Sequence, residues 1–349
     1  MIPIENIYYL LCYSWDCLSE KDRVKVDAND FKNMPELFAK VLVNASNILL
    51  KRGVEKNYID HHEEIPGIKG KFLLNESLKH NSLWYQKAIC LYDDLSPDIL
   101  SNQILFTTLN NLSNSKSIKS DLRKEVIAAK RKFTGISLIP LTSSLFQTVK
   151  IHRNNRFYGF ILNVCNILFE CMLPEEKQGK YSFTDFTRDK DKMNKLFESF
   201  VRNFYRKYSS YNLSSSKISW QFEGDEFDKK LLPDMRTDIT LENKNQKIII
   251  DTKFYTKTVG EYFNKTSLHS NNLYQIFSYL IQQEDGTLKS QNAIGILLYP
   301  TIEEELNLNY MYHNHKIAIR TVNLNVHWTE IHSRLIEIME NIQINDVTL

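Results

Sequence analysis

Residues 231–255 read LLPDMRTDITLENKNQKIIIDTKFY, and this stretch decides how the second half of the chain folds. It contains two runs rich in β-branched and aromatic residues, LPDMRTDITLE and KIIIDTKFY, separated by the polar tetrapeptide NKNQ at positions 243–246. Extended runs joined by an asparagine-containing turn predict a β-hairpin. We expect each run to form one strand.

The turn also predicts which residues of the hairpin lie opposite each other. If it is centred between Lys244 and Asn245, Asp238 lies directly across from Asp251. Opposed residues have Cβ atoms about 5 Å apart and point to the same face of the sheet. Lys253 lies two residues beyond Asp251 on the same strand and shares that face. The hairpin is therefore expected to bring together two carboxylates and one ammonium group.

This cluster has the composition of a metal-dependent catalytic site. Two close carboxylates repel each other unless a cation lies between them, and their hard oxygen atoms suit Mg²⁺. Such an ion can activate water and polarise a phosphodiester. A nearby lysine can position the nucleophile or stabilise the developing negative charge. We therefore expect Mg²⁺ as the cofactor, with Asp238 and Asp251 among its ligands.

The competing interpretation is a solvated sheet face that carries a cross-strand charge cluster. The run Ile248, Ile249 and Ile250 argues against it, because a continuous apolar run is typical of a strand buried on both faces. Asp251 and Lys253 lie at the end of that run, where an unpaired charge is costly. These neighbours favour the functional interpretation.

Length and charge limit the classes of protein that the chain can represent. Its 349 residues are enough for two domains, and 42% hydrophobic residues favour globular folding. With 44 basic and 42 acidic side chains, the net charge is only +2. Binding to nucleic acid would therefore depend on local patches or on a partner protein.

The cysteines and the apolar segments indicate a cytoplasmic protein without membrane association. Five cysteines form no CxxC pair, which is typical of a reducing compartment. Glu5 and Asn6 interrupt the N-terminus before any signal-peptide core. The most apolar segment, 158–173, carries Asn166 and Glu170, so we expect a core helix and not a membrane span.

The first half of the chain predicts helices around a small β-unit. Helical periodicity marks 31–51, 96–112 and 120–132, whereas 58–74 is extended and contains glycines, which predicts a hairpin or small β-unit. Ile65 occupies the position where a phosphate-binding loop ending at Gly70 would need its first glycine. We therefore do not expect this chain to bind a nucleotide itself.

The second half predicts a mixed sheet flanked by helices. A polar segment, PEEKQGK at 174–180, is the best candidate for a linker, and we place an α+β N-terminal domain at 1–160 and a second domain at 161–349. After the linker come a helix at 189–208, the hairpin, a helix at 272–283, strands at 293–299 and 317–324, and a helix at 328–342. This order predicts an α/β fold.

Three further side chains are candidates for the site around the hairpin. Glu198 lies at the edge of the apolar stripe of its helix, so it could reach a metal on the sheet or pair with Arg202 four residues on. Gln275 and Tyr279, also four residues apart, are expected on the face of the helix 272–283 opposite its buried stripe. That face could be an exposed polar surface or one turned toward substrate.

The first acidic residue of the hairpin has two candidates. Asp234 follows a proline directly, whereas Asp238 satisfies the hairpin register, and we choose Asp238. Together with Asp251, Thr252 and Lys253, it resembles the PD-(D/E)XK signature of restriction-endonuclease-like nucleases.

Over nearly its full length the chain resembles the McrC family, the nuclease subunits of McrBC methylcytosine-dependent restriction systems. The segments that carry this resemblance are IPIENIYYLLCYSW (2–15), IPGIKGK (65–71), LLPDMRTDIT with IIIDTKFY, and HSNNLYQIFSYL (269–280). In the last of these, Gln275 and Tyr279 form a QxxxY pattern that follows the lysine in a subset of PD-(D/E)XK nucleases.

The resemblance implies a Mg²⁺-dependent DNA endonuclease whose N-terminal domain docks into the pore of a hexameric McrB-type AAA+ GTPase and stimulates GTP hydrolysis. That partner would recognise modified cytosine in double-stranded DNA. The implied catalytic residues are Asp238, Asp251, Lys253, Gln275 and Tyr279, and the implied metal ligands are Asp238, Asp251 and Glu198. The candidate partner contact is the IPGIKGK segment, with Gly67, Lys69, Gly70 and Lys71.

Two other functions are compatible with the same residues. The chain could be a GTPase-activating assembly module whose nuclease fold is inert, or a repair nuclease that acts alone. Cleavage of methylated DNA in the presence of the partner and GTP excludes the first. Cleavage without them would favour the second.

Overall fold

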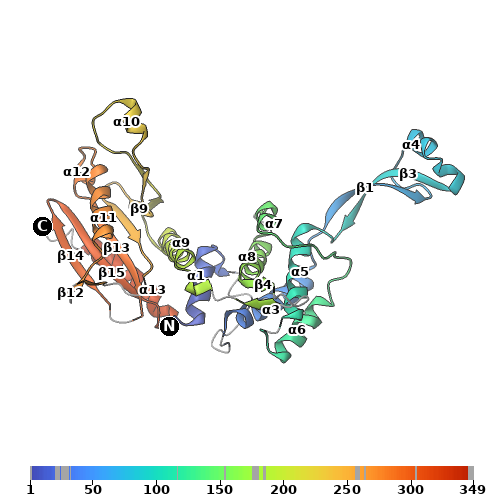
Figure 1. Cartoon of the computed structure of the whole chain (residues 1–349), viewed down its shortest axis with the longest axis horizontal. Helices are drawn as coiled ribbons and strands as arrows, with labels where there is room; N and C mark the ends of the chain where they lie inside the picture. The colour runs from blue at the N-terminus through green and yellow to red at the C-terminus, as the bar shows by residue number, and fades with distance from the viewer. Residues whose placement is uncertain are drawn as a thin grey trace. The chain divides into compact units, whose positions relative to one another are not determined.

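The structure, a computed structural model, divides the chain into two compact units (Figure 1). It describes residues 2–19, 24, 31, 33–115, 117–152, 155–174, 181–183, 186–255, 260–262, 265–302 and 305–344. One unit, here called the sheet unit, consists of residues 2–18 and 186–344. The other, the helical unit, consists of the described residues between 19 and 183.

This division differs from the predicted boundary after residue 160 in two respects. Helix α8 (Arg156–Cys171) crosses that position and packs on α3 (Met34–Arg52) and α5 (Leu100–Asn114). The first helix, α1 (Ile4–Ser14), packs along α9 (Lys190–Tyr208) in the sheet unit. The cause is apolar burial, since the aromatic rings on α1 are buried against those of α9.

The helical unit has a core of four helices, and the predicted helices lie close to the observed ones. A buried face recurs at helical spacing in each, as the periodicity predicts. The predicted helix at 96–112 begins four residues too early, because Ser96 still belongs to a strand. The fourth core helix is α6 (Ser120–Lys130), and shorter elements of this unit are α7 (Ser143–Thr148), β4 (Met172–Pro174) and β5 (Tyr181–Phe183).

A three-stranded sheet forms an arm of the helical unit, with the order β1 (Asn57–Pro66), β3 (Lys87–Ser96), β2 (Lys71–Phe72). The predicted small β-unit is confirmed, but a hairpin within 58–74 is wrong, because β1 and β2 both pair with β3. The connecting loop therefore crosses one face of β3. Short helices α4 (Leu74–Lys79) and η2 (Ser82–Tyr85) lead from β2 back to β3 (Figure 1).

The sheet unit is built on a six-stranded mixed sheet with the order β14-β15-β13-β10-β9-β6. Strands β10, β13 and β15 run parallel to one another, and β14, β9 and β6 are antiparallel to their neighbours. The α/β class with a mixed sheet flanked by helices is confirmed. The strands are β6 (Asn212–Ser214), β9 (Ile239–Glu242), β10 (Lys247–Thr252), β13 (Ile294–Thr301), β14 (Asn307–Tyr312) and β15 (His315–Asn323).

The predicted hairpin is formed by β9 and β10, and its register is confirmed from Ile239 opposite Ile250 to Glu242 opposite Lys247. In the turn, the side-chain oxygen of Asn243 accepts hydrogen bonds from the backbone N–H groups of Asn245 (2.9 Å) and Gln246 (2.8 Å). This is the local bonding for which asparagine is favoured in turns.

The first arm of the hairpin is interrupted, contrary to the prediction of one continuous strand. A separate strand, β8 (Met235–Arg236), pairs with β7 (Lys217–Ile218), and Thr237 and Asp238 lie between β8 and β9. The edge strands β6 and β14 were not predicted, because their mostly exposed side chains lack the apolar runs that mark the inner strands.

Helices cover both faces of the sheet. Helix α11 (Ser270–Gln282) packs on the face that carries Ile249, through Ile276 and Leu280. Helix α9 packs on β10, and α13 (Trp328–Ile344) packs on β15. Helix α1 packs on both of these helices. Within the described residues, no helix is long and apolar enough to span a membrane. The short elements are η4 (Phe186–Arg188), α10 (Glu226–Lys230), α12 (Leu288–Gln291), β11 (Gly260–Tyr262) and β12 (Lys265–Ser267).

Candidate active site

Asp251 and Lys253 form an ion pair at the end of the central strand β10. The Nζ atom of Lys253 lies 2.8 Å from Oδ2 of Asp251, whose side chain is completely buried. Two backbone hydrogen bonds fix this end of the strand. The N–H of Lys253 donates to the carbonyl of Leu298 on β13 (3.1 Å), and that of Phe254 donates to Oδ1 of Asn194 on α9 (2.8 Å).

Asp238 faces the same end of β10 from the neighbouring segment. Its Oδ2 atom accepts hydrogen bonds from the backbone N–H (2.8 Å) and the hydroxyl (3.0 Å) of Thr252. The strand pairing of β9 and β10 ends at Ile239 and Ile250, and the next contact between the two segments is the one between Asp238 and Thr252. Asp234 lies elsewhere: its side chain is 79% exposed and pairs with Lys217 at 2.6 Å. The structure thus brings Asp238, and not Asp234, to the end of β10.

The charges of these groups act on one another. Burial, together with the negative charges of Asp238 and Glu198, raises the pKa of Asp251 to about 7, although Lys253 opposes the shift. Burial lowers the pKa of Lys253, but the charge of Asp251 outweighs it, and the net shift is upward. The pair therefore holds a charged lysine next to a carboxyl group that changes its charge near neutral pH.

Glu198 pairs with Arg202 on α9, which is one of its two predicted roles. Burial and the charge of Asp238 raise the pKa of Glu198, and the guanidinium of Arg202 opposes that rise. In the described part of the chain, no three His, Cys, Asp or Glu side chains converge closely enough to hold a metal by themselves. A metal role for Glu198 stays a prediction.

One observation indicates that the carboxylates of Asp251 and Asp238 suit Mg²⁺. Oδ1 of Asp251 is buried and has no hydrogen-bond partner among the described residues. Buried polar atoms are nearly always paired, so an oxygen left unpaired calls for a ligand. Mg²⁺ is commonly held by one or two carboxylates and completes its shell with water and phosphate oxygens. Asp251 and Asp238 supply such a set.

Gln275 and Tyr279 bind each other, and Tyr279 binds the main chain two residues before Asp238. The Nε2 atom of Gln275 donates to the hydroxyl of Tyr279 (2.7 Å), and that hydroxyl donates to the carbonyl of Arg236 (2.9 Å). Tyr279 is buried, and Gln275 is half-buried. The prediction that the tyrosine lies opposite the buried stripe is therefore wrong, because its ring belongs to the core under α11.

Sequence reasoning missed several polar groups that hold the site together. Thr252 was visible as the middle residue of the Asp-X-Lys pattern, yet nothing in that pattern indicates that its hydroxyl binds Asp238. Asn194 and Ser215 left no signal, since their partners lie 60 and 22 residues away along the chain. Contacts over such separations depend on the fold and not on local pattern.

The predicted partner contact lies in the arm of the helical unit. Gly67 and Gly70 have positive φ angles of 90° and 67°, and a Cβ atom on Gly70 would lie 2.6 Å from the carbonyl oxygen of Leu91. Lys69 pairs with Asp94 (3.1 Å), its Nζ lying 4.1 Å from the ring centroid of Tyr92. Lys71 is the first residue of β2 and is exposed.

Comparisons with known proteins match the chain over most of its length. A family model described as McrBC 5-methylcytosine restriction system component matches residues 5–300. The Type IV methyl-directed restriction enzyme EcoKMcrBC of Escherichia coli strain K12 is 32% identical over 344 residues, covering 97% of this chain and 98% of that protein.

Two solved structures are also similar. One is a refined half-complex from the tetradecameric assembly of Thermococcus gammatolerans McrB AAA+ hexamers with bound McrC. It matches with a TM-score of 0.54 and 16% identity, covering 93% of this chain and 76% of that chain, which shows a common fold. The other, a cryo-EM structure of the McrBC complex of the same organism, matches 60% of each chain at 20% identity and a TM-score of 0.42.

Proposed function

Because the chain belongs to the family of McrBC 5-methylcytosine restriction system components, we propose that it is the nuclease subunit of such a system. Its reaction is the Mg²⁺-dependent hydrolysis of phosphodiesters in double-stranded DNA that contains modified cytosine. One observation carries the proposal: the buried Asp251 has an unpaired carboxylate oxygen next to Lys253 and within electrostatic reach of Asp238.

The residues of the site divide the work of the reaction. Asp251 and the oxygen of Asp238 that Thr252 leaves free would hold the metal. A bound Mg²⁺ supplies Lewis-acid stabilisation of the phosphate and a more acidic water. Lys253, kept charged by its neighbour, stabilises negative charge that develops on the phosphate or orients the attacking water. Tyr279 and Gln275 hold the segment that carries Asp238.

The proposal assigns a hexameric McrB-type AAA+ GTPase as the partner, whose GTP hydrolysis this chain stimulates. The similar Thermococcus gammatolerans structure contains McrB AAA+ hexamers with bound McrC. The arm supports an interaction surface, because it exposes Trp84 (86%), Tyr85 (74%) and Ile68 (69%). Exposed apolar side chains of this size are candidate contacts for a partner protein.

The test compares the wild-type chain with Asp251→Ala in the presence of the partner, GTP, Mg²⁺ and methylcytosine-containing DNA. The wild type is expected to cleave the DNA, and the variant to lose cleavage while it still stimulates GTP hydrolysis. Retained stimulation shows that the variant is folded and assembled. Cleavage by the variant at the wild-type rate would contradict the site, and absence of cleavage by the wild type would contradict the function.

A further inference from the structure

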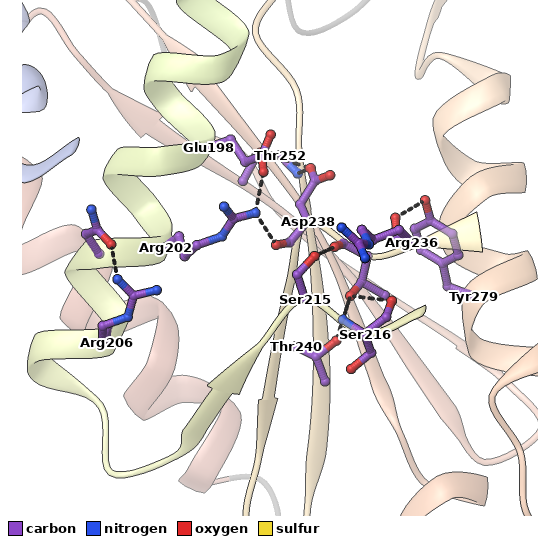
Figure 2. A network of polar contacts seen from close by, with 12 residues as sticks. Glu198, Arg202, Arg206, Ser215, Ser216, Arg236, Asp238, Thr240, Thr252 and Tyr279 are labelled. Atoms are coloured by element: carbon purple, nitrogen blue, oxygen red, sulfur yellow. Dashed lines mark hydrogen bonds and ion pairs between the residues drawn. The ribbon is translucent and has the colours of Figure 1, made fainter. Parts of the chain in front are cut away.

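The segment 236–238, which delivers Asp238 to the site, is held by side chains at three successive carbonyl groups. The hydroxyl of Tyr279 donates to the carbonyl of Arg236 (2.9 Å), that of Ser215 to Thr237 (2.7 Å), and the guanidinium of Arg202 to Asp238 (2.8 Å). These donors come from α11, from the segment after β6 and from α9. Figure 2 shows them converging on the segment from different sides.

Arg202 differs from the other two donors because it carries a charge and binds two groups. Its Nη2 atom donates both to the carbonyl of Asp238 and to the carboxylate of Glu198, one turn earlier on α9. The two side chains of the pair are 27% and 30% exposed, so solvent screens them only in part. Arg202 thus joins a rigid helix to the main chain of Asp238 and keeps Glu198 turned toward itself.

The position of the Asp238 main chain decides where its carboxylate lies. Thr252 fixes Oδ2 of the carboxylate. The direction in which the other oxygen points therefore depends on the position of the Asp238 main chain. No strand pairing holds Asp238 itself, because the ladder begins at Ile239. The guanidinium of Arg202 donates a hydrogen bond to the carbonyl of Asp238, and this bond fixes the main chain at that residue.

We propose that Arg202 is a positioning residue for the nuclease site: by binding the main chain of Asp238 and the carboxylate of Glu198, it sets the geometry in which Asp238 can hold a metal. This inference rests on the proposed nuclease function. It also gives Glu198 a role as the partner of Arg202. Groups that orient metal ligands typically change metal affinity or activity by about 10- to 100-fold when they are removed.

The test uses Arg202→Gln, with Arg206→Gln as the matched control. Arg206 lies one turn later on α9 and binds Asn203, away from the site (Figure 2). Calorimetric titration with Mg²⁺ is expected to give about 10- to 100-fold weaker binding for Arg202→Gln and wild-type binding for Arg206→Gln. The Mg²⁺ concentration for half-maximal DNA cleavage should rise in parallel, while GTPase stimulation stays at the wild-type value.

Two outcomes would overturn the proposal: wild-type Mg²⁺ affinity in Arg202→Gln, or an equal loss of affinity in both variants. If Arg202→Gln does not fold, Arg202→Lys replaces it. That variant keeps the charge but lacks the planar fork, and it is expected to weaken Mg²⁺ binding in the same direction. Failure of the wild-type chain to bind Mg²⁺ or cleave DNA would contradict the nuclease function itself, which separates the two proposals.

Discussion

The environment of Asp251 differs from that of an ordinary surface carboxylate. It is completely buried at the end of an apolar strand, and its nearest cation is Lys253 at 2.8 Å. Water stabilises the charged form of a carboxyl group, so removal from water favours the protonated form. The result is a carboxyl group whose pKa is raised to about 7.

The first prediction concerns that pH dependence. A carboxyl group must lose its proton to bind a metal, so below its raised pKa of about 7 protons compete with Mg²⁺ at Asp251. The affinity should fall with decreasing pH, and calorimetric titration is expected to give about tenfold weaker Mg²⁺ binding at pH 6 than at pH 8. Circular dichroism at both pH values controls for unfolding. Equal affinities at the two pH values would contradict the prediction.

At the residue scale, the sequence predicted which acidic groups meet but not what holds them. The turn at Asn243 and the Ile248–Ile250 run predict the register that pairs Ile239 with Ile250, but the pairing ends there and Asp238 binds Thr252. The bond from Thr252 to Asp238 and the role of Tyr279 could not be predicted. Both depend on how far the pairing of β9 extends and on how α11 rotates, and local pattern determines neither.

At the element scale, the close approach of α11 to β13 sets the position of Gln275 and Tyr279 behind the site. Gly295 on β13 makes this approach possible, because a Cβ atom there would lie 2.8 Å from Cγ1 of Ile276 and 3.0 Å from Cδ1 of Leu280. Both contacts are shorter than packed side chains normally allow, so any larger residue would push α11 away from the sheet.

Gly295→Ala should therefore destabilise the protein. Overpacking of a filled core typically costs about 1–3 kcal/mol, and urea unfolding should show a loss in that range. Gly224→Ala is the matched control in the same unit, because the nearest atom to a Cβ there, on Asp228, is 4.0 Å away. That control should stay within about 0.5 kcal/mol of the wild type. Equal stabilities of the two variants would show that α11 can move without loss.

The arm allows a separate prediction about the partner. Lys69 pairs with Asp94 on the exposed surface, where solvent screens the pair and it contributes little to stability, so Lys69→Glu should leave the arm folded. We expect the charge reversal to weaken the stimulation of GTP hydrolysis in the McrB-type partner. Lys87→Glu, which breaks the pair with Glu64 on the same sheet, is the control. Undiminished stimulation by Lys69→Glu would exclude this loop as a contact.

At the scale of the whole molecule, the chain begins and ends in the same unit. Residues 2–18 belong to the sheet unit, the chain then forms the helical unit, and it returns at residue 186. Asn6 secures the beginning, donating to the carbonyls of Leu324 (2.8 Å) and Val326 (2.7 Å). The arm and the candidate active site thus belong to different units.

The sequence predicted the mixed sheet and most of its helices. It did not predict that residues 2–18 join the sheet unit. Local periodicity marks an element such as α1, but its packing on α9 joins residues about 190 positions apart, as in the bonds from Asn203 to the carbonyls of Tyr13 and Ser14. The predicted linker at 174–180 lies, from residue 175 on, outside the described residues, so it stays a prediction.

The most direct test of the central claim compares two aspartates that lie four residues apart. Cleavage of methylcytosine-containing DNA is measured for Asp238→Asn and Asp234→Asn, each with the partner, GTP and Mg²⁺. Loss of Asp238 should slow cleavage by about a thousandfold or more, because a metal ligand supports several kcal/mol of transition-state stabilisation. Loss of the exposed Asp234 should change the rate by about twofold at most. Wild-type cleavage by Asp238→Asn, or its loss in Asp234→Asn alone, would contradict the account.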